Sequence, residues 1–286
     1  MTPSTKHMSN LDLPSGLERF RSKLEPTVKT YIDIQTRFTR KTTLWQSKFA
    51  GFPYLPKDFE YPTTPEGDYL HLLAQINFDE APHLAGFPTT GILQFYIAKD
   101  GMYGLAFENP TRQSNFRVLY FPEPDLNEKN LITDFDFLPT LWDYKEIPFY
   151  VFPSYVPHRD DCFALSFNLK TAPISDCDYQ FEELIGSEIW DVLQANDHAL
   201  WKEYQEKFVS GHRIGGYPNF AQADFREDLP ENEEPYVLLL QIDSDPGELE
   251  KVSIEWSDMG VGNFWIKASA LKNRDFSEVL YNWDCS

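Results

Sequence analysis

Cysteine is scarce in this chain, and its three occurrences do not suggest disulfides. Cys162, Cys177 and Cys285 are an odd set with no paired spacing, whereas a disulfide framework uses an even set at close spacings. The first ten residues are polar and lack an apolar signal segment. Both observations predict a cytoplasmic protein with free, buried thiols.

Long apolar runs are also missing. The longest, residues 236–240, has the length of a strand, whereas a membrane helix needs about 20 apolar residues. The sequence therefore predicts no membrane contact. Hydrophobic residues still make up 42% of the chain and aromatic residues 16%, enough for a sizeable core, and this excludes an intrinsically disordered protein.

Motifs for metal binding and catalysis are lacking. The six histidines show neither His-x-x-x-His nor Glu-x-x-His spacing, and no Gly-x-Ser-x-Gly elbow occurs. Residues 243–247 are similar to the start of a calcium loop, but the glycine stands fifth and the twelfth residue is Ile254. Gly260-Val261-Gly262 lacks the lysine and the helix of a phosphate loop, and a bulged hairpin explains it better. We predict no catalytic residue, no metal and no cofactor.

Basic residues are outnumbered, 25 against 45 acidic residues, for a net charge of −20. Residues 1–50 hold nine basic and four acidic side chains, which is +5, so the remainder carries −25. Such a surface repels phosphate backbones and argues against nucleic acid as a partner. It would attract a basic protein, or simply maintain solubility. The candidate partner surface is the acidic loop around Glu231, Glu233 and Glu234, which could equally be a solvated spacer.

One pattern occurs twice along the chain. In the front half, Gly51-Phe52-Pro53 precedes Gln75 by 24 residues, counted from the glycine, and Val118-Leu119-Tyr120 follows. In the back half, Gly216-Tyr217-Pro218 precedes Gln241 by 25 residues, and Val279-Leu280-Tyr281 follows. The shared order predicts an old duplication, with the strands of Gln75 and Gln241 at equivalent places in two superimposable lobes.

Gln75 and Gln241 each interrupt an apolar run. A buried amide must find partners for its two donors and its acceptor. We expect each glutamine to hold the neighbouring Gly-Pro loop through backbone hydrogen bonds, a role that we favour over ligand binding.

Turn and strand signals dominate the rest of the chain, with three helical segments. A helix is predicted over 15–25, capped by Ser15 and ended by Pro26, and two more over 178–195 and 197–209, with Gly211 as the C-terminal cap. Residues 122–177 are predicted to form a connector that packs on the surface and contains short strands. Strands are predicted over 28–34, 70–76, 92–98, 102–107, 116–121, 236–242, 252–256, 263–266 and 279–283.

These elements predict an α+β fold. Two related β-rich lobes of mostly antiparallel strands are expected, with a short N-terminal helix and a central helical pair. The chain is expected to form a single globule over 1–286. Within it, the first lobe spans 27–124, the connector with two helices 125–211, and the second lobe 212–286.

The repeated segments resemble the YwqG-like family of bacterial proteins, known by its domain of unknown function 1963. The resemblance spans nearly the whole chain from about Leu13, and the set of motifs is specific. Gln75, Gln241, Asp243, Asp258 and Gly260 fall on motif positions, and Ser257 replaces an expected glycine. The motifs are KFAGFPYLP at 48–56, LLAQIN at 72–77, GILQFY at 91–96, VLYF at 118–121, GGYP at 215–218, LLQIDSD at 239–245, WSDMGVG at 256–262 and VLYNWDC at 279–285.

The resemblance implies an α+β cytoplasmic protein without assigned catalytic residues. Some members are encoded beside bacterial toxin genes, which implies an immunity- or antitoxin-like role. The leading hypothesis is therefore a non-enzymatic protein-binding protein. The alternative is an enzyme or small-ligand binder that uses the cleft between the two lobes. An exposed aromatic and acidic patch would favour the first, and a deep pocket with convergent polar groups the second.

Overall fold

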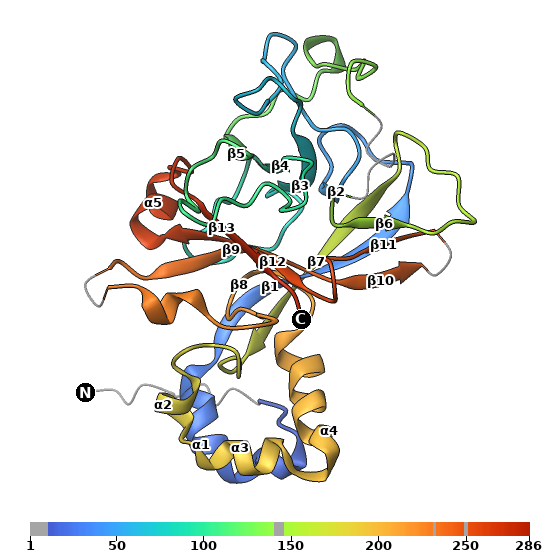
Figure 1. Ribbon diagram of the computed structural model, residues 1–286. Coiled ribbons are helices and arrows are strands. Elements are labelled where there is room, and N and C mark those ends of the chain that lie inside the picture. The colour runs from blue at the N-terminus through green and yellow to red at the C-terminus, as the bar shows by residue number, and fades with distance from the viewer. Residues whose placement is uncertain (1–10, 140–145, 231–232, 249–250) are drawn as a thin grey trace.

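A computed structural model describes residues 11–139, 146–230, 233–248 and 251–286 (Figure 1). Its strands are β1 (Lys29–Thr39), β2 (Lys48–Phe49), β3 (His71–Asn77), β4 (Ile92–Ile97), β5 (Phe116–Phe121), β6 (Phe149–Val151), β7 (Cys162–Ala172), β8 (His212–Gly215), β9 (Tyr236–Asp243), β10 (Asp245–Glu248), β11 (Val252–Ile254), β12 (Val261–Lys267) and β13 (Leu280–Asp284). Its helices are η1 (Ser15–Phe20), α1 (Arg21–Leu24), η2 (Glu25–Thr27), η3 (Glu128–Asn130), α2 (Phe181–Ile185), α3 (Glu188–Leu193), α4 (Ala195–Tyr204), η5 (Gln205–Val209), η6 (Phe225–Asp228) and α5 (Ala268–Asn273).

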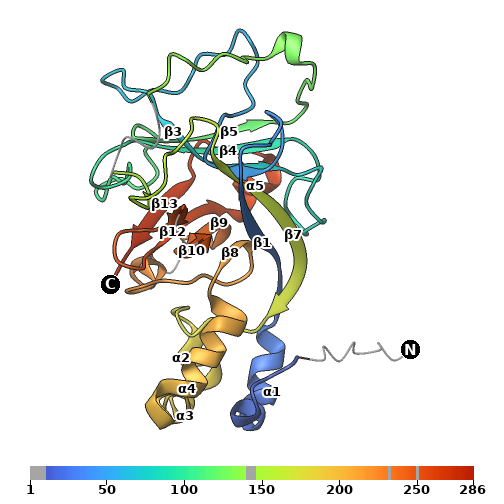
Figure 2. The ribbon, with the colours of Figure 1, turned by 90° about the vertical axis from the view of Figure 1, so that its right-hand side faces the viewer.

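The strands form a ten-stranded sheet and a three-stranded sheet. The large sheet has the order β13-β12-β9-β8-β1-β7-β2-β3-β4-β5, and the small one has the order β10-β11-β6. The pairings are antiparallel, as predicted. The long strands β1 and β7 pair at the centre, and Figure 2 shows them side by side.

The strand order is symmetric about the β1–β7 pair. Outward from β7 follow β2, β3, β4 and β5, which we call the front half of the sheet; outward from β1 follow β8, β9, β12 and β13, which we call the back half. Gln75 on β3 and Gln241 on β9 therefore lie equally far from the centre, within one continuous sheet.

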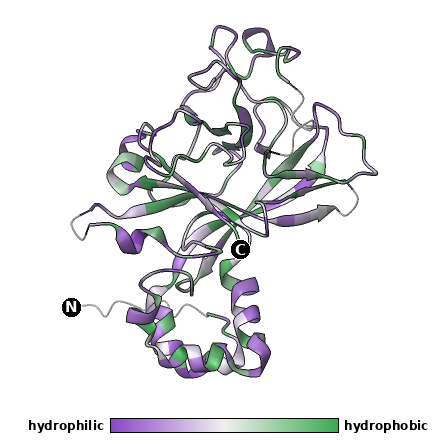
Figure 3. Cartoon of the chain, in the orientation of Figure 1, coloured by the Kyte–Doolittle hydropathy of each residue, from purple (hydrophilic) through white to green (hydrophobic). Residues whose placement is uncertain are grey.

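The large sheet curls, so its two ends face each other across the main core. The ring of Phe95 on β4 lies 4.7 Å from that of Phe264 on β12, and the ring of Phe116 on β5 lies 5.3 Å from that of Tyr281 on β13. β3 is buried on both faces, as its apolar run predicted. Figure 3 shows hydrophobic residues along these strands, while the helices carry both hydrophobic and hydrophilic residues.

Whereas α5 lies beside the large sheet, helices α1 to α4 gather at one end of the molecule around a second core (Figures 1 and 2). Leu17, Phe20 and Leu24 are buried there, as predicted. The predicted helix over 15–25 is mostly 3-10 helix, its Ser15 makes no capping bond, and Pro26 lies inside the last turn. Among the described helices, none has the length and hydrophobicity to cross a membrane.

The second and third predicted helices are broken. Gly186 has a φ of +95° and separates α2 from α3, where one helix over 178–195 was predicted. Residues with a side chain rarely adopt this backbone conformation, which is why glycine is favoured at this break. Residues 196–198 are left-handed, so the helix predicted from Asp197 becomes regular only after them.

The prediction of a surface connector over 122–177 is wrong in its last part. β7 lies in the centre of the large sheet between β1 and β2. Its residues are mostly half-buried or exposed, so its apolar pattern is weak. Pairing with β1 on one side and β2 on the other supplies the backbone hydrogen bonds instead.

Two smaller predictions also fail. No strand covers 102–107; Tyr103 and Gly104 have φ values of +50° and +80° and form turns. The segments predicted at 252–256 and 263–266 do not form a hairpin, because β11 belongs to the small sheet and β12 to the large one. Gly260 is confined between them, and a Cβ there would lie 2.1 Å from Asp284 O.

Candidate functional site

A row of three buried polar side chains crosses the front half of the sheet. Lys48 on β2 pairs in register with Gln75 on β3, and Gln75 with Gln94 on β4. Side chains directly opposite each other in an antiparallel sheet point to the same face. We call Lys48, Gln75 and Gln94 the front row; their exposed fractions are 1%, 0% and 0%.

The front row holds the loop around Gly51-Phe52-Pro53 by its backbone. Gln75 Oε1 accepts from Tyr54 N at 2.8 Å, and Gln94 Nε2 donates to Tyr54 O at 2.6 Å. Gln75 Nε2 donates to the carbonyls of Leu44 and Gln46, both at 2.8 Å. Gln75 thus has the buried, loop-tethering role expected from its apolar run.

The back half repeats this arrangement. Arg213 on β8 pairs in register with Gln241 on β9, and Gln241 with Asn263 on β12. Gln241 Oε1 accepts from Asn219 N at 2.7 Å, and Asn263 Nδ2 donates to Asn219 O at 2.9 Å. Asn219 follows Gly216-Tyr217-Pro218 as Tyr54 follows Gly51-Phe52-Pro53. We call Arg213, Gln241 and Asn263 the back row.

The cation in each row bonds to carbonyl oxygens. Lys48 Nζ donates to Thr43 O at 2.5 Å and to Phe52 O at 3.0 Å. Burial lowers the pKa of the Lys48 ammonium to about 8. Desolvation disfavours the charged form of a buried amine, and carbonyl dipoles compensate only in part.

Arg213 makes more bonds than Lys48. Its Nη1 donates to Phe208 O at 2.9 Å and Tyr217 O at 3.3 Å, and its Nη2 to Val209 O at 2.6 Å and Ser210 O at 3.0 Å. Burial lowers the pKa of Arg213, although a guanidinium keeps its charge in proteins.

Sequence reasoning found the glutamines and missed their partners in the two rows. Lys48 and Arg213 each stand three residues before the glycine of a Gly-aromatic-Pro motif. That equal spacing was the available signal. A lone buried base or amide has no periodicity of its own, so only the strand register reveals the row.

The front and back halves of the sheet differ in the residue that precedes the cation of each row. In front, Asn77 N donates to Ser47 Oγ at 2.9 Å. At the back, Asp243 N donates to His212 Nδ1 at 3.0 Å, and His212 Nε2 lies 3.4 Å from Asp245 Oδ2. This geometry assigns the proton to Nε2, since Nδ1 is the acceptor.

The two aspartates near His212 differ in environment. Burial raises the pKa of the Asp243 carboxyl. The hydrogen bond from His212 lowers the pKa of Asp245 to about 2, so Asp245 is a permanent negative charge near neutral pH. Asp243 also accepts from Gly211 N at 2.7 Å, and Asp245 from Thr36 Oγ1 at 3.0 Å.

A cavity of about 490 Å³ opens beside these aspartates, between β1 and residues 210–212 and 243–247. The hydrogen bonds of Asp243 and Asp245 go to backbone and side chains of the surrounding strands and loops. The hydrogen bonds of Asp243 and Asp245 therefore connect β1, β8 and β9. Within the described residues, no group of three histidines, cysteines or carboxylates is placed to hold a metal ion.

The segment from Ser244 to Pro246 also borders a larger concavity of about 910 Å³, which we call the aromatic hollow. It lies along the small sheet. Its lining residues are Tyr103, Ile147, Phe149, Tyr150, Val151, Phe152, Ser244, Asp245, Pro246, Ser253, Ile254, Glu255, Ser257 and Met259.

The aromatic hollow combines exposed apolar groups with negative charge. Tyr150 and Met259 are 45% and 65% exposed. Asp245 and Glu255 are its carboxylates, and no lysine, arginine, histidine or cysteine is among the described lining residues. Met259 has a left-handed φ of +53°, a strained conformation that is enriched at functional sites.

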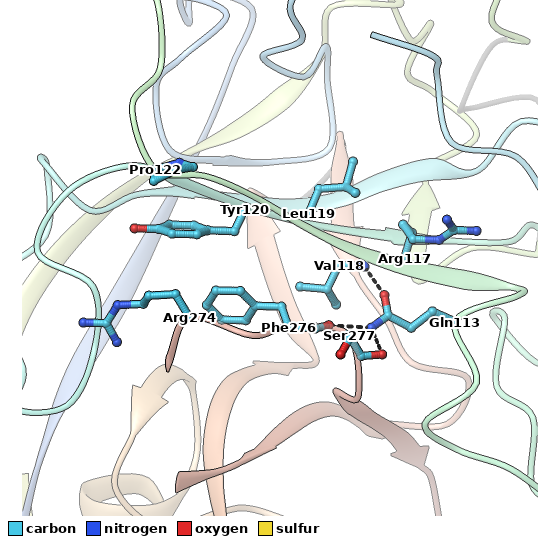
Figure 4. Close-up of a pocket in the computed structure, with 9 residues that line it drawn as sticks. All are labelled: Gln113, Arg117, Val118, Leu119, Tyr120, Pro122, Arg274, Phe276 and Ser277. Carbon is cyan, nitrogen blue, oxygen red and sulfur yellow. Dashed lines mark hydrogen bonds between the residues drawn. The ribbon is translucent and has the colours of Figure 1, made fainter. Parts of the chain in front are cut away.

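A third cavity, of about 670 Å³, lies between β5 and residues 274–277 (Figure 4). It is the seam between the two halves of the curled sheet. We call it the seam pocket. Its lining residues are Gln113, Arg117, Val118, Leu119, Tyr120, Pro122, Arg274, Phe276 and Ser277.

The acidic loop proposed from the sequence is largely bonded within the chain. Glu233 Oε1 lies 2.6 Å from Lys267 Nζ, and Glu234 accepts from Ser269 N at 2.6 Å, at the start of α5. Glu231 falls outside the described residues. Asp258, another motif position, is exposed in the turn after β11.

All three cysteines are free, as predicted, but only Cys162 is buried; Cys177 and Cys285 are half-buried. Burial raises the pKa of Cys162, and it raises that of Cys177 to about 11. Since the thiolate is the nucleophile, neither of these two thiols is activated near neutral pH.

Comparison with known proteins identifies the chain only at the level of family. No curated protein matches it. From residue 47 to residue 285, covering both rows and most of the sheet, the sequence matches the family described as a domain of unknown function, DUF1963, and the chain belongs to that family.

Proposed function

We propose that this protein is a non-enzymatic binding protein whose aromatic hollow captures a basic segment of a partner protein. The observation that carries the proposal is the lining of the hollow, which has four aromatic rings and two carboxylates without a described base. Lysine and arginine side chains are attracted to aromatic faces and to carboxylates.

The charges near the hollow suit this role. Asp245 keeps its charge because its pKa is about 2. Glu255 is half-buried beside the aromatic rings, where the local dielectric is lower than in water and attraction is stronger. The net charge of −20 adds a long-range field that speeds encounter with a basic protein.

The apolar groups supply the anchor. Tyr150 packs edge-on against Phe152, with ring centroids 5.2 Å apart. Met259 is flexible and polarisable, so it adapts to different side chains. An interface centre of this kind, with aromatic anchors beside a few charges, typically carries most of the binding energy.

A catalytic role for the hollow is less well supported. General acid–base or nucleophilic chemistry needs a nucleophile within reach of a base. The hydroxyl of Ser244 donates to Gly260 O at 2.7 Å, so it is committed to the backbone. No histidine or cysteine lines the described hollow.

The test uses short peptides as probes. Tetra-arginine and tetra-glutamate peptides are titrated into the full chain by calorimetry at two salt concentrations. Only tetra-arginine should bind, and more weakly at high salt. Tyr150→Ala and Glu255→Gln should each weaken binding about 3- to 10-fold.

Glu66→Gln is the matched control, because Glu66 is exposed and does not line the hollow. It removes the same charge and should leave the affinity unchanged. Equal affinity for tetra-arginine in the wild type, Tyr150→Ala and Glu255→Gln would reject the hollow as the binding site.

We also infer that the two halves of the sheet descend from a duplicated ancestor. The support is the repeated order of motifs, the symmetric strand order and the matched rows. An experimental structure should superimpose β2–β5 on β8, β9, β12 and β13 with Lys48 over Arg213. Strands that do not superimpose would contradict the duplication.

A further inference from the structure

The seam pocket is built by both halves of the sheet. β5 is the last strand of the front half, and residues 274–277 join α5 to β13 of the back half. Its volume of about 670 Å³ falls within the roughly 300–1,000 Å³ of small-molecule sites. A ligand bound here would contact both halves at once.

Gln113 fixes the geometry of the seam. Its Oε1 accepts from Val118 N at 2.7 Å, and its Nε2 donates to Phe276 O at 2.6 Å and Ser277 O at 3.1 Å. Figure 4 shows these bonds as dashed lines. Because Gln113 occupies Val118 N on the outer edge of β5, it blocks an added peptide strand there and favours a small molecule.

The charge of the pocket is opposite to that of the protein. The chain has 45 acidic and 25 basic residues, yet the lining contains two arginines and no carboxylate. Figure 4 places Arg117 and Arg274 at opposite ends, with Tyr120, Val118 and Phe276 between them.

Arg274 is held in place by the protein. Its Nη1 donates to Gly86 O at 2.8 Å and Leu271 O at 2.7 Å, and its Nη2 to Phe87 O at 2.9 Å. These partners are neutral carbonyls, so the positive charge is positioned but not neutralised. It contributes a fixed field at one end of the pocket.

Arg117 has no partner of opposite charge. Its side chain is half-buried, and no ion pair joins Arg117 to a carboxylate in the described part of the chain. Its Nε is closed off from solvent, like that of Arg213, so the terminal Nη groups are the ones that a ligand can reach. These two groups suit an anion, since a guanidinium pairs with carboxylate or phosphate through parallel bonds.

The middle of the pocket is apolar. The ring of Tyr120 lies 5.2 Å from that of Phe276, and the Tyr120 hydroxyl is directed away to Thr90 O at 2.9 Å. Val118 lies on the same face of β5 as Tyr120, whereas Leu119, like Arg117, points to the other face and lines the pocket across the edge of the strand. A ligand would thus meet an apolar surface beside a positive charge.

We propose that the seam pocket binds a small organic anion, with its carboxylate or phosphate on Arg117 and its apolar body against Val118 and Phe276. This site is separate from the aromatic hollow, and its ligand has the opposite charge. The protein would thus have one site for a basic segment and one for an acidic small molecule.

The test uses benzoate and phenyl phosphate as probes, benzamide as the uncharged analogue of benzoate, and inorganic phosphate to isolate the anionic group. Binding to the full chain is measured by ligand-detected NMR and calorimetry at constant ionic strength. At least one of the two aromatic anions should bind about 10-fold more tightly than benzamide and than inorganic phosphate. The better of the two identifies carboxylate or phosphate as the preferred group.

Arg117→Gln should weaken the aromatic anion about 10- to 100-fold and leave benzamide nearly unchanged. Arg112→Gln is the matched control; Arg112 is exposed on the preceding loop and does not line the pocket, so this variant should bind as the wild type does. Equal binding of benzoate, phenyl phosphate and benzamide, or of inorganic phosphate and phenyl phosphate, would overturn the proposal.

Thermal melting without ligand separates a binding role from a structural one. An arginine that serves binding and has no ion-pair partner within the protein adds little stability, so the melting temperature of Arg117→Gln should be unchanged or higher. A large fall in melting temperature would assign Arg117 to the fold and overturn the proposal.

Discussion

The front and back halves of the sheet hold their Gly-aromatic-Pro loops with different cations at the same place. In front, the Lys48 ammonium bonds to carbonyl oxygens that include Thr43 O and Phe52 O. At the back, the Arg213 guanidinium bonds to four carbonyl oxygens. Ammonium has three donors and guanidinium five. In each half one bond reaches the aromatic residue of the loop, Phe52 or Tyr217, and the others reach the segment that precedes β2 or β8. Either side chain can therefore link the loop to that segment.

The second difference lies beside the rows. Ser47 and His212 accept the same kind of backbone bond, from Asn77 N and Asp243 N respectively. The back half therefore replaces neutral groups with titratable ones, and it does so next to Asp245 at the border of the aromatic hollow. The shared bonds serve the fold, and the added charges indicate where to look for function.

Replacing the two buried cations should give the largest loss of stability, and the loss should differ between the two halves. Arg213→Met should lower the free energy of unfolding by about 3 kcal/mol or more, because four buried carbonyls lose their donors. Lys48→Met should cost about 2 kcal/mol or less, since it frees fewer bonds and removes a destabilising buried charge. Urea denaturation measures both. Arg213→Lys should fall between Arg213→Met and wild type, and equal losses at the two sites would contradict the comparison.

The contribution of Lys48 to the free energy of unfolding should change at alkaline pH. The folded pKa of Lys48 is about 8, below its ordinary value of 10.5, so the unfolded chain binds more protons between these pH values. Its contribution to stability therefore rises with pH there. Relative to Lys48→Met, the wild type should gain about 2 kcal/mol between pH 8 and pH 10. Parallel stability curves for the two proteins would contradict the lowered pKa.

The glutamines should have similar effects with a slight asymmetry. Gln241→Leu should cost about 1–2 kcal/mol through unpaired backbone groups. Gln75→Leu should cost slightly more, because Gln75 Oε1 also accepts from Gln94 Nε2 at 2.8 Å. Gln180→Leu, at an exposed position, is the control and should be nearly neutral. Unchanged urea midpoints for both row variants would mean that the loops do not depend on these amides.

The smallest predicted effect is the acid sensitivity of the back half. The pKa of Asp245 is lowered to about 2 in the folded chain, so its stabilisation is present above the unfolded pKa of about 3.9 and is lost as pH falls toward 2. The loss should be about 1 kcal/mol, after allowance for partial exposure. His212→Ser, which installs the residue of the front half, should remove this acid-dependent part. An identical pH dependence in both proteins would rule out His212 as its cause.

Several elements follow from local sequence. β4 and β5 were predicted to within a residue at each end, because continuous or alternating apolar runs between turn residues leave few alternatives. The burial of Gln75 and Gln241 was also predictable, since an amide inside a two-sided apolar strand has no route to solvent. The family was identified from the motifs alone.

Other elements were missed because their stability is not local. β7 has a weak apolar pattern, and its place depends on pairing with β1 across more than a hundred residues of chain. The predicted helix over 178–195 has a good apolar periodicity, but Gly186 turns left-handed in the tertiary packing. Intrinsic propensity is a weak guide when distant contacts decide.

The sequence by itself determined which segments are buried, which loops need backbone donors, and that the surface is acidic, because hydrophobicity and charge are properties of the residues. Tertiary structure alone decided that the sheet curls, that Lys48 and Arg213 complete matched rows, and that the aromatic hollow and the seam pocket exist. These features bring together residues such as Arg117 and Phe276 that are far apart in the chain. Their proximity depends on strand register and sheet closure, which arise only when the whole core packs.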